Sequence, residues 1–213
     1  MSVTQSIKRP LVVLTGPTAV GKTKLSIALA KAIDGEILSA DSMQVYKHMD
    51  IGSAKIRPEE MQGVPHHLID ILEPWEEFNV VVFKKRCLEC MEQIYDRGHI
   101  PILVGGTGFY IQAVLRGIDF TENEENTEYR QKLEHLASEQ GPEVLHDMLA
   151  KVDPVSALNI HANNIKRTIR ALEYYELTGE PISVHNEREK ERTSPYNFSY
   201  FVLTDDREKL YAR

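Results

Sequence analysis

The chain has 213 residues, and its shares of 42% hydrophobic and 27% charged residues are those of a globular protein, which excludes a disordered, collagen-like or fibrous chain. The net charge of -7 argues at first against a nucleic-acid partner, but residues 120–160, with 3 basic and 9 acidic residues, carry -6 of it. Two cysteines are too few for a disulfide framework and no apolar run is long enough to span a membrane, so we expect a cytoplasmic protein that does not enter the membrane.

The first half of the chain alternates strand and helix patterns. Leu11 to Thr15 is a continuous apolar run, which is typical of a strand buried on both faces of a parallel sheet. Asn79 is a good N-cap for a helix that ends before Gly98. This alternation predicts an α/β fold, a P-loop-type parallel sheet with flanking crossover helices. The predicted strands are 11–15, 36–40, 67–71 and 99–104, and the predicted helices are 24–33, 79–97 and 109–115.

The pattern changes after Gly117. Residues 121–127 are polar and acidic, and no strand-like run returns until 198–203. The chain between them carries helical patterns at 128–138, 143–151, 154–160 and 164–177. We therefore expect a P-loop α/β core at 1–119, an all-helical insertion at 120–192 and a return to the core at 193–213. The mixed-charge run 187–192 is expected to be solvated and mobile.

A phosphate-binding loop follows the first predicted strand. Residues 16–23 match G-x-x-x-x-G-K-[ST], with a strand leading in and a helix leading out. Backbone N–H groups of such a loop surround phosphate oxygens, Lys22 can reach the terminal phosphates, and the Thr23 hydroxyl can ligate Mg²⁺. The motif is typical of nucleotide-binding and ATP-binding proteins, and it indicates a diphosphate or triphosphate group but not the reaction. The predicted binding residues are Gly16, Pro17, Thr18, Ala19, Val20, Gly21, Lys22 and Thr23.

Two further segments end predicted strands. Asp41 stands where open α/β sheets bind ligands, and a water-mediated Mg²⁺ contact, a general base and a capping aspartate all fit it. Val104 runs into Gly105-Gly106-Thr107-Gly108 and not into the acidic residue of P-loop hydrolases, which weakens an ATPase function. Close approach of a bulky substrate and a plain tight turn both explain these glycines.

A basic group lies on the last helix of the expected insertion. Lys166, Arg167 and Arg170 fall within about one helical turn, so they suit phosphate binding. A solvated helix face that includes Glu173 is the more common explanation of such a group.

Two other features favour packing over chemistry. Cys87 and Cys90 form a C-x-x-C within a predicted helix, with no second pair to complete a metal site. Trp75, Phe78 and Phe83 favour core or lid packing over a base-stacking platform.

Several ordered blocks of the sequence resemble a known family. Together with the P-loop they cover nearly all of the chain, and they resemble the tRNA dimethylallyltransferases, also called tRNA isopentenyltransferases, of the IPP transferase family. The blocks are residues 16–23, Asp41-Ser42-Met43-Gln44-Val45-Tyr46, 49–55, Pro65-His66-His67-Leu68, 104–108, Asp153-Pro154 and 167–173.

The resemblance implies transfer of a dimethylallyl group from dimethylallyl diphosphate to N6 of the adenosine 3′-adjacent to the anticodon in tRNA. Asp41 would be the general base, Thr18 would lie near the bridging oxygen of the donor, and Lys22 with Mg²⁺ on Thr23 would neutralise the leaving diphosphate. The partners would be the tRNA anticodon stem-loop, with its target base extruded, and dimethylallyl diphosphate, and we expect a monomer. The implied tRNA contacts are Asp41, Ser42, Met43, Gln44, Thr107, Arg130, Asn163, Asn164, Ile165, Lys166 and Arg167.

The chain departs from the family in two places. Asn164 stands where the family usually has Asp, and the family continues past Arg213 with an arginine that assists the leaving diphosphate. We therefore expect these 213 residues alone to have little or no transferase activity. The alternatives are a small-molecule or nucleotide kinase of the same P-loop architecture and a nucleotide-dependent binding module without chemistry, which the convergence of Asp41 and the P-loop disfavours.

Overall fold

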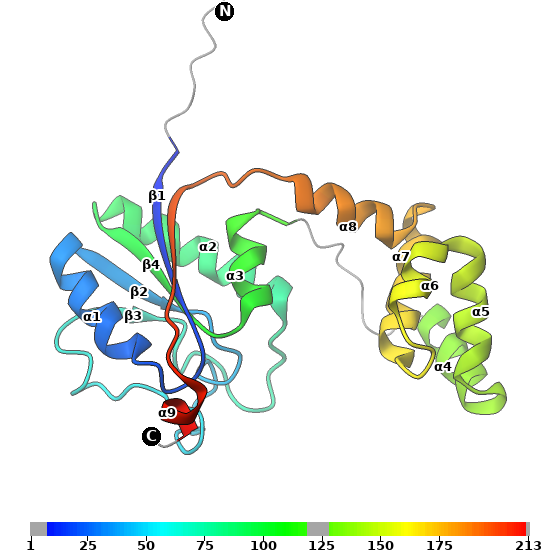
Figure 1. The fold of residues 1–213 in the computed structure, drawn as a ribbon, viewed down its shortest axis with the longest axis horizontal. Helices are drawn as coiled ribbons and strands as arrows, with labels where there is room; N and C mark the ends of the chain where they lie inside the picture. The colour runs from blue at the N-terminus through cyan, green and yellow to red at the C-terminus, as the bar shows by residue number, and fades with distance from the viewer. Residues whose placement is uncertain (1–7, 119–127, 212–213) are drawn as a thin grey trace, which may run out of the picture. The chain divides into compact units, whose positions relative to one another are not determined.

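The computed structural model describes residues 8–118 and 128–211. Contacts within the chain divide it into two compact units, residues 1–118 with 193–213 and residues 119–192. The first unit is α/β, and the second is helical throughout its described elements (Figure 1). Within the described ranges, no helix combines the length and the apolar character needed to cross a bilayer.

A parallel sheet forms the centre of the α/β unit (Figure 1). Its five described strands lie in the order β3-β2-β4-β1-β5, and every pairing is parallel. This confirms the predicted fold class. The carboxyl ends of β1, β2 and β4 meet at one edge of the sheet, which is where open α/β sheets bind ligands. The strands are β1 (Pro10–Thr15), β2 (Gly35–Ser39), β3 (His66–His67), β4 (Ile100–Gly105) and β5 (Asn197–Val202).

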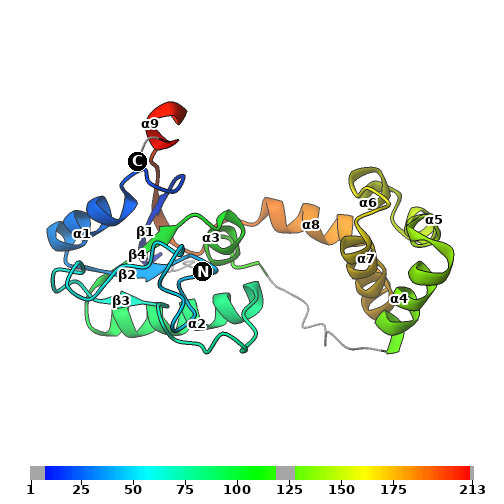
Figure 2. The same cartoon turned by 90° about the horizontal axis from the view of Figure 1, so that it is seen from below.

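Helices cover the sheet through alternating side chains. Ile37 of β2 and Ile102 of β4 pack with Ile27 of α1 in one apolar cluster. The next residues along each strand, Leu38 and Leu103, point to the other face and are fully buried. Helix α2 lies along the sheet (Figure 2) and buries Phe83, Cys87, Met91 and Ile94 at helical spacing. The helices of this unit are α1 (Lys22–Ile33), α2 (Val80–Asp96), α3 (Gly108–Leu115) and α9 (Arg207–Tyr211).

The predicted strand at 67–71 is wrong in extent. Strand β3 comprises His66 and His67 alone. Leu68 and Asp70 have φ of 63° and 53°, left-handed values that end the extended backbone. The chain turns there toward the segment after β2, because the Asp70 N–H donates to the Gln44 carbonyl.

The second unit packs its helices around a separate core. Leu133, Leu145, Leu149, Ile169 and Leu172 form its centre. The helices are α4 (Glu128–Gln140), α5 (Pro142–Val152), α6 (Pro154–Asn159), α7 (Ile165–Thr178) and α8 (Ile182–Glu191).

Helix α8 was not predicted. Residues 187–191, expected to be a solvated and mobile run, belong to this helix. Four of them are exposed, as a solvated run should be, and the expectation is wrong only for the buried Glu189. The helix has no apolar repeat in its sequence. A long-range contact anchors its start instead, since the Ser183 N–H and hydroxyl both donate to the buried carboxylate of Asp153.

Candidate active site

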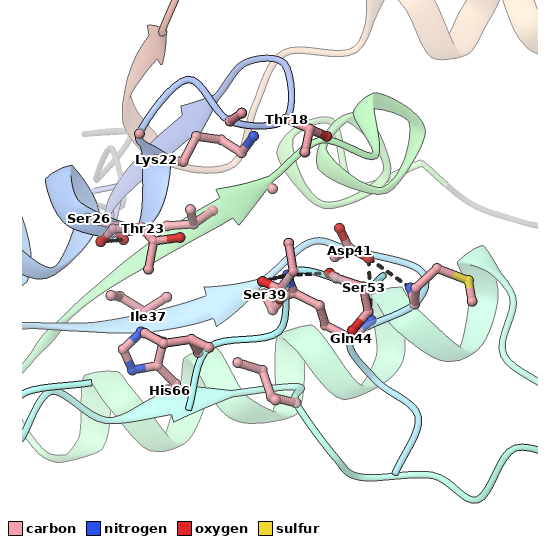
Figure 3. Close-up of a pocket in the computed structure, with 18 of the residues that line it drawn as sticks. Thr18, Lys22, Thr23, Ser26, Ile37, Ser39, Asp41, Gln44, Ser53 and His66 are labelled. Atoms are coloured by element: carbon pink, nitrogen blue, oxygen red, sulfur yellow. Dashed lines mark hydrogen bonds between the residues drawn. The ribbon is translucent and has the colours of Figure 1, made fainter. Parts of the chain in front are cut away.

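A cavity of about 440 Å³ opens at the carboxyl ends of β2 and β4, beside the loop that follows β1 (Figure 3). Its wall comes from the P-loop and the start of α1, from the segment after β2 and from the turn at 52–56. Many of the residues predicted from sequence to bind phosphate or tRNA come together here. They are Thr18, Ala19, Gly21, Lys22, Thr23, Asp41, Met43 and Gln44.

The P-loop joins β1 to α1 as its motif predicts. Gly21 is the N-cap of α1 with φ of 96°, a left-handed value that favours glycine. The Lys22 ammonium folds over the loop and donates to the carbonyls of Gly16 and Pro17, at 2.7 Å in both cases. Burial lowers the pKa of Lys22, and the negative charge of Asp41 opposes that shift. The loop thus presents a cation and a helix N-terminus to the cavity, a combination that binds phosphate groups.

Asp41 lies two residues after β2 and lines the cavity (Figure 3). Its Oδ1 accepts the backbone N–H of Met43 at 2.8 Å and that of Gln44 at 3.3 Å, so the carboxylate caps the turn that follows it. Among the described residues, Oδ2 accepts no hydrogen bond. The capping role and a proton-accepting role are therefore compatible, because each uses a different oxygen.

Gln44 links Asp41 to the far wall of the cavity. Its side-chain oxygen accepts the Ser39 hydroxyl at 2.9 Å. Its side-chain nitrogen donates to the Ser53 carbonyl at 3.3 Å and to the Ala54 carbonyl at 3.1 Å. Sequence reasoning missed the roles of Ser39, Ser53 and Ala54, although the last two fall within the family-like block 49–55.

One part of the cavity wall is apolar. Ile37, Ile56 and Ile69 line it and belong to the cluster that packs under α1. His66 lines the cavity beside them, with its Nδ1 2.8 Å from the Val64 carbonyl, and burial lowers its pKa. A neutral imidazole and three isoleucines suit an uncharged, largely hydrocarbon group.

Gly105, the last residue of β4, has a structural explanation. A Cβ on Gly105 would lie 2.2 Å from the Ala40 carbonyl oxygen, so the backbone that follows β2 requires glycine there. This close backbone packing is neither of the two explanations expected from the sequence, a bulky substrate or a tight turn. Thr107 follows, and its N–H donates to Ala40 while its carbonyl accepts from Tyr110 and Ile111 at the start of α3.

In the helical unit, Arg130 has an unexpected partner. Its guanidinium donates Nε to Oε1 of Glu173 at 3.0 Å and Nη2 to Oε2 at 2.8 Å. Glu173 is only 2% exposed. The expectation that Glu173 belongs to a solvated face with the basic residues of α7 is therefore wrong. Arg130, predicted as a tRNA contact, is first of all the counter-charge of a buried carboxylate.

The other predicted tRNA contacts of the helical unit surround the start of α7. Asn164 is its N-cap and accepts the Arg167 N–H at 3.4 Å. Ile165 is half-buried, whereas Asn163, Lys166 and Arg167 are exposed. Arg170 is exposed as well, one turn further along. A helix N-terminus with two exposed cations is a good anion-binding surface.

The packing expectations are only partly correct. Cys87 is buried in α2, which raises the pKa of its thiol, and no group of three metal-ligating side chains occurs within residues 8–118 or 128–211. Phe83 is fully buried and stacks on Tyr110 with centroids 4.4 Å apart. Phe78 contacts both of these rings edge to face. Trp75 is 81% exposed, so core packing is wrong for this residue, and lid packing stays a prediction.

Two family models match the sequence. The model described as IPP transferase matches residues 44–213, and the model described as isopentenyl transferase matches residues 10–71. Among curated proteins, the tRNA dimethylallyltransferase of Lachnoclostridium phytofermentans is 66% identical over 203 residues, and that of Carboxydothermus hydrogenoformans is 54% identical over the same length. Each match covers 95% of this chain but 65% of the relative, so the chain spans less than two thirds of their length.

Solved structures resemble the chain as well. A eukaryotic dimethylallyltransferase acting on tRNA has a TM-score of 0.83 at 33% identity, covering 96% of this chain and 50% of that one. The full-length tRNA isopentenylpyrophosphate transferase of Bacillus halodurans has a TM-score of 0.64 at 47% identity, covering 96% and 63%. The likeness therefore extends to both sequence and fold.

Proposed function

The chain belongs to the IPP transferase family, and we propose that it transfers a dimethylallyl group from dimethylallyl diphosphate to N6 of the adenosine 3′-adjacent to the anticodon in tRNA. The observation that carries this proposal is the composition of one cavity. It combines a P-loop with Lys22, a carboxylate with one available oxygen at Asp41, and an apolar wall of isoleucines. A prenyl diphosphate has the matching parts, an anionic head and a hydrocarbon tail.

The P-loop would hold the donor's diphosphate. Backbone N–H groups at the start of α1 and the Lys22 ammonium would neutralise its charge, with Thr18 near the oxygen that bridges to the prenyl carbon. Loss of diphosphate from C1 leaves positive charge on the allyl group. The isoleucine wall would exclude water there and so protect the group from hydrolysis.

Asp41 would act on the acceptor. The adenine N6 attacks C1, the C1–O bond breaks, and diphosphate departs with the bonding electrons. The N6 proton passes to Oδ2 of Asp41, while Oδ1 stays bound to the turn. The target base must leave its stack to reach this position, as bases do in other enzymes that modify them.

Mg²⁺ is the cofactor we propose. Magnesium keeps several waters and binds through one or two protein oxygens together with substrate phosphates, so the Thr23 hydroxyl beside the P-loop fits it. Bound there, the ion would add positive charge at the leaving diphosphate.

We propose that the tRNA is held by residues of both units. In the α/β unit these are Asp41, Ser42, Met43, Gln44 and Thr107. In the helical unit they are Arg130, Asn163, Asn164, Ile165, Lys166 and Arg167, with the start of α7 as the anion-binding surface. Apart from Arg130, the acidic segment 120–160 would contribute little.

The test is incubation with unmodified tRNA, Mg²⁺ and labelled dimethylallyl diphosphate. Because the chain spans 65% of its relatives, the assay compares the 213 residues with a chimera that adds the rest of the 66% identical relative. Transfer of the label by the chimera to the adenine N6 of the tRNA supports the proposal. No label, together with phosphate transfer from ATP to a metabolite, would favour a kinase.

A further inference from the structure

Lys55 is a buried cation outside the cavity. Its side chain is 4% exposed. Its ammonium donates to the Tyr46 carbonyl at 2.8 Å, to Oδ1 of Asp50 at 2.7 Å and to Oδ1 of Asp70 at 2.5 Å. An ammonium has three donors, so all of them are used. Lys55 therefore ties together three separate segments: the turn after β2, the 50–55 loop and the turn after β3.

The loop that Lys55 anchors forms part of the active-site wall. Its Ser53 and Ala54 carbonyls accept the side-chain nitrogen of Gln44. Ala54 has φ of 49°, a left-handed value that a non-glycine residue keeps only when its surroundings hold it. The contacts form a continuous series from Lys55 through the loop to Gln44, whose own N–H donates to Oδ1 of Asp41.

We propose that Lys55 is a positioning residue for this site: it holds the 50–55 loop so that Gln44 keeps the Asp41 carboxylate in place for proton transfer. The inference rests on the proposed function. A direct contact between Lys55 and a substrate phosphate does not fit, because its side chain is buried, its donors are committed and it does not line the cavity. Burial lowers the pKa of Lys55, but the hydrogen bonds to Asp50 and Asp70 outweigh this and raise it overall, so the group is charged at neutral pH.

The first experiment compares Lys55→Met with Lys47→Met. Lys47 lies a few residues before this loop and pairs with Glu73, but its side chain is 42% exposed and does not line the cavity. Because a misplacement of about 1 Å can cost about 10²-fold in rate, we expect kcat of Lys55→Met, measured in the chimera, to fall by about that factor. The affinity for inorganic pyrophosphate, which reports the P-loop, should stay within about 2-fold. Lys55→Arg should recover part of kcat, and Lys47→Met should match the unmodified protein.

A double-mutant cycle tests the route through Gln44. If Lys55 acts through Gln44, the variant carrying both Lys55→Met and Gln44→Ala has nearly the kcat of Gln44→Ala alone. The proposal is overturned if the kcat losses of the two single variants multiply in the double variant. It is also overturned if Lys55→Met has the same kcat as Lys47→Met. Should Lys55→Met fail to fold, Asp70→Asn replaces it, because it removes the negative charge from one of the three acceptors at an exposed position.

Amide hydrogen exchange of the 213-residue chain separates this inference from the function itself. Lys55→Met should speed exchange at the Met43 and Gln44 N–H groups, which bind Asp41, and leave the core of α2 unchanged. Unchanged exchange at those two amides refutes the positioning role whether or not the protein transfers prenyl groups. If the unmodified chimera transfers no label while the exchange result holds, the proposed function fails and the positioning contact stands.

Discussion

The two units of this chain each depend on an aspartate that caps a turn or helix, and the two carboxylates are used differently. In the α/β unit, Asp41 binds two backbone N–H groups through Oδ1 alone. In the helical unit, Asp153 is 1% exposed and receives the N–H and hydroxyl groups of both Ser156 and Ser183 on its two oxygens. A carboxylate saturated with donors can only stabilise the fold, whereas one with an available oxygen facing a cavity can also accept a proton.

The largest effect on activity is expected at Asp41, whose Oδ2 accepts no hydrogen bond from the described residues. If Asp41 accepts the N6 proton as proposed, Asp41→Ala made in the chimera removes that acceptor, so we expect kcat to fall by about 10²–10⁴-fold, with a much smaller change in tRNA affinity. Single-turnover transfer and filter binding measure the two quantities. The comparison predicts that Asp153→Ala changes stability and leaves single-turnover chemistry of the folded protein nearly intact. An unchanged kcat in Asp41→Ala would reduce Asp41 to a turn cap.

The next effect concerns the buried ion pair of the helical unit. Arg130→Met removes the guanidinium from the 2% exposed Glu173, and breaking one partner of a buried pair typically costs about 3–5 kcal/mol. We expect the unfolding free energy of this unit to fall by about 3 kcal/mol, measured by urea denaturation.

Arg188→Met is the matched control for that variant. Arg188 also makes a bidentate contact, with Glu180 at 3.0 and 2.7 Å, but its side chain is 59% exposed. Exposed pairs contribute about 0–1 kcal/mol, so this variant should be almost neutral. Equal losses in the two variants would mean that the burial of Glu173 does not set the cost.

The part of this molecule that could be predicted from sequence is local. The P-loop and the strand before it have their signal in adjacent residues, and Asp41 is placed by the end of an apolar run. Helix α8 could not be predicted, because the carboxylate that starts it is 30 residues away along the chain. The burial of Glu173 could not be predicted for the same reason. A charged side chain on a helix is expected to face solvent, and its partner Arg130 is 43 residues earlier in the chain.

A third, smaller effect is a pH dependence of the helical unit. Burial acts to raise the pKa of Asp153, but hydrogen bonds from Ser183 and Ser156 outweigh it and hold the pKa below its ordinary value. The stability from this group is therefore complete above the unfolded pKa of about 3.9 and is lost as the pH falls through the folded value.

Denaturation curves across that range check this sign. The unfolding free energy of the helical unit should decline below about pH 4, and Asp153→Asn should remove that part of the decline. At neutral pH, Asp153→Ala should cost about 2 kcal/mol, the upper end for a lost helix cap. A decline of the same size in Asp153→Asn would assign it to other carboxylates.

The smallest expected effect is on the salt dependence of tRNA binding, at the surface of the helical unit. Lys166 and Arg167 are exposed at the start of α7, where positive charge adds to the helix dipole. If both contact tRNA phosphates, replacing them with alanine should flatten the dependence of log K on log salt by up to about two units. The matched control replaces Lys132 and Lys151, which are exposed on α4 and α5 and remove the same charge. Net charge alone would flatten both slopes equally, so a change confined to the α7 variant assigns the contact to that helix end. An unchanged slope would return these residues to a solvated face and leave Asp41 and its neighbours as the main tRNA contacts.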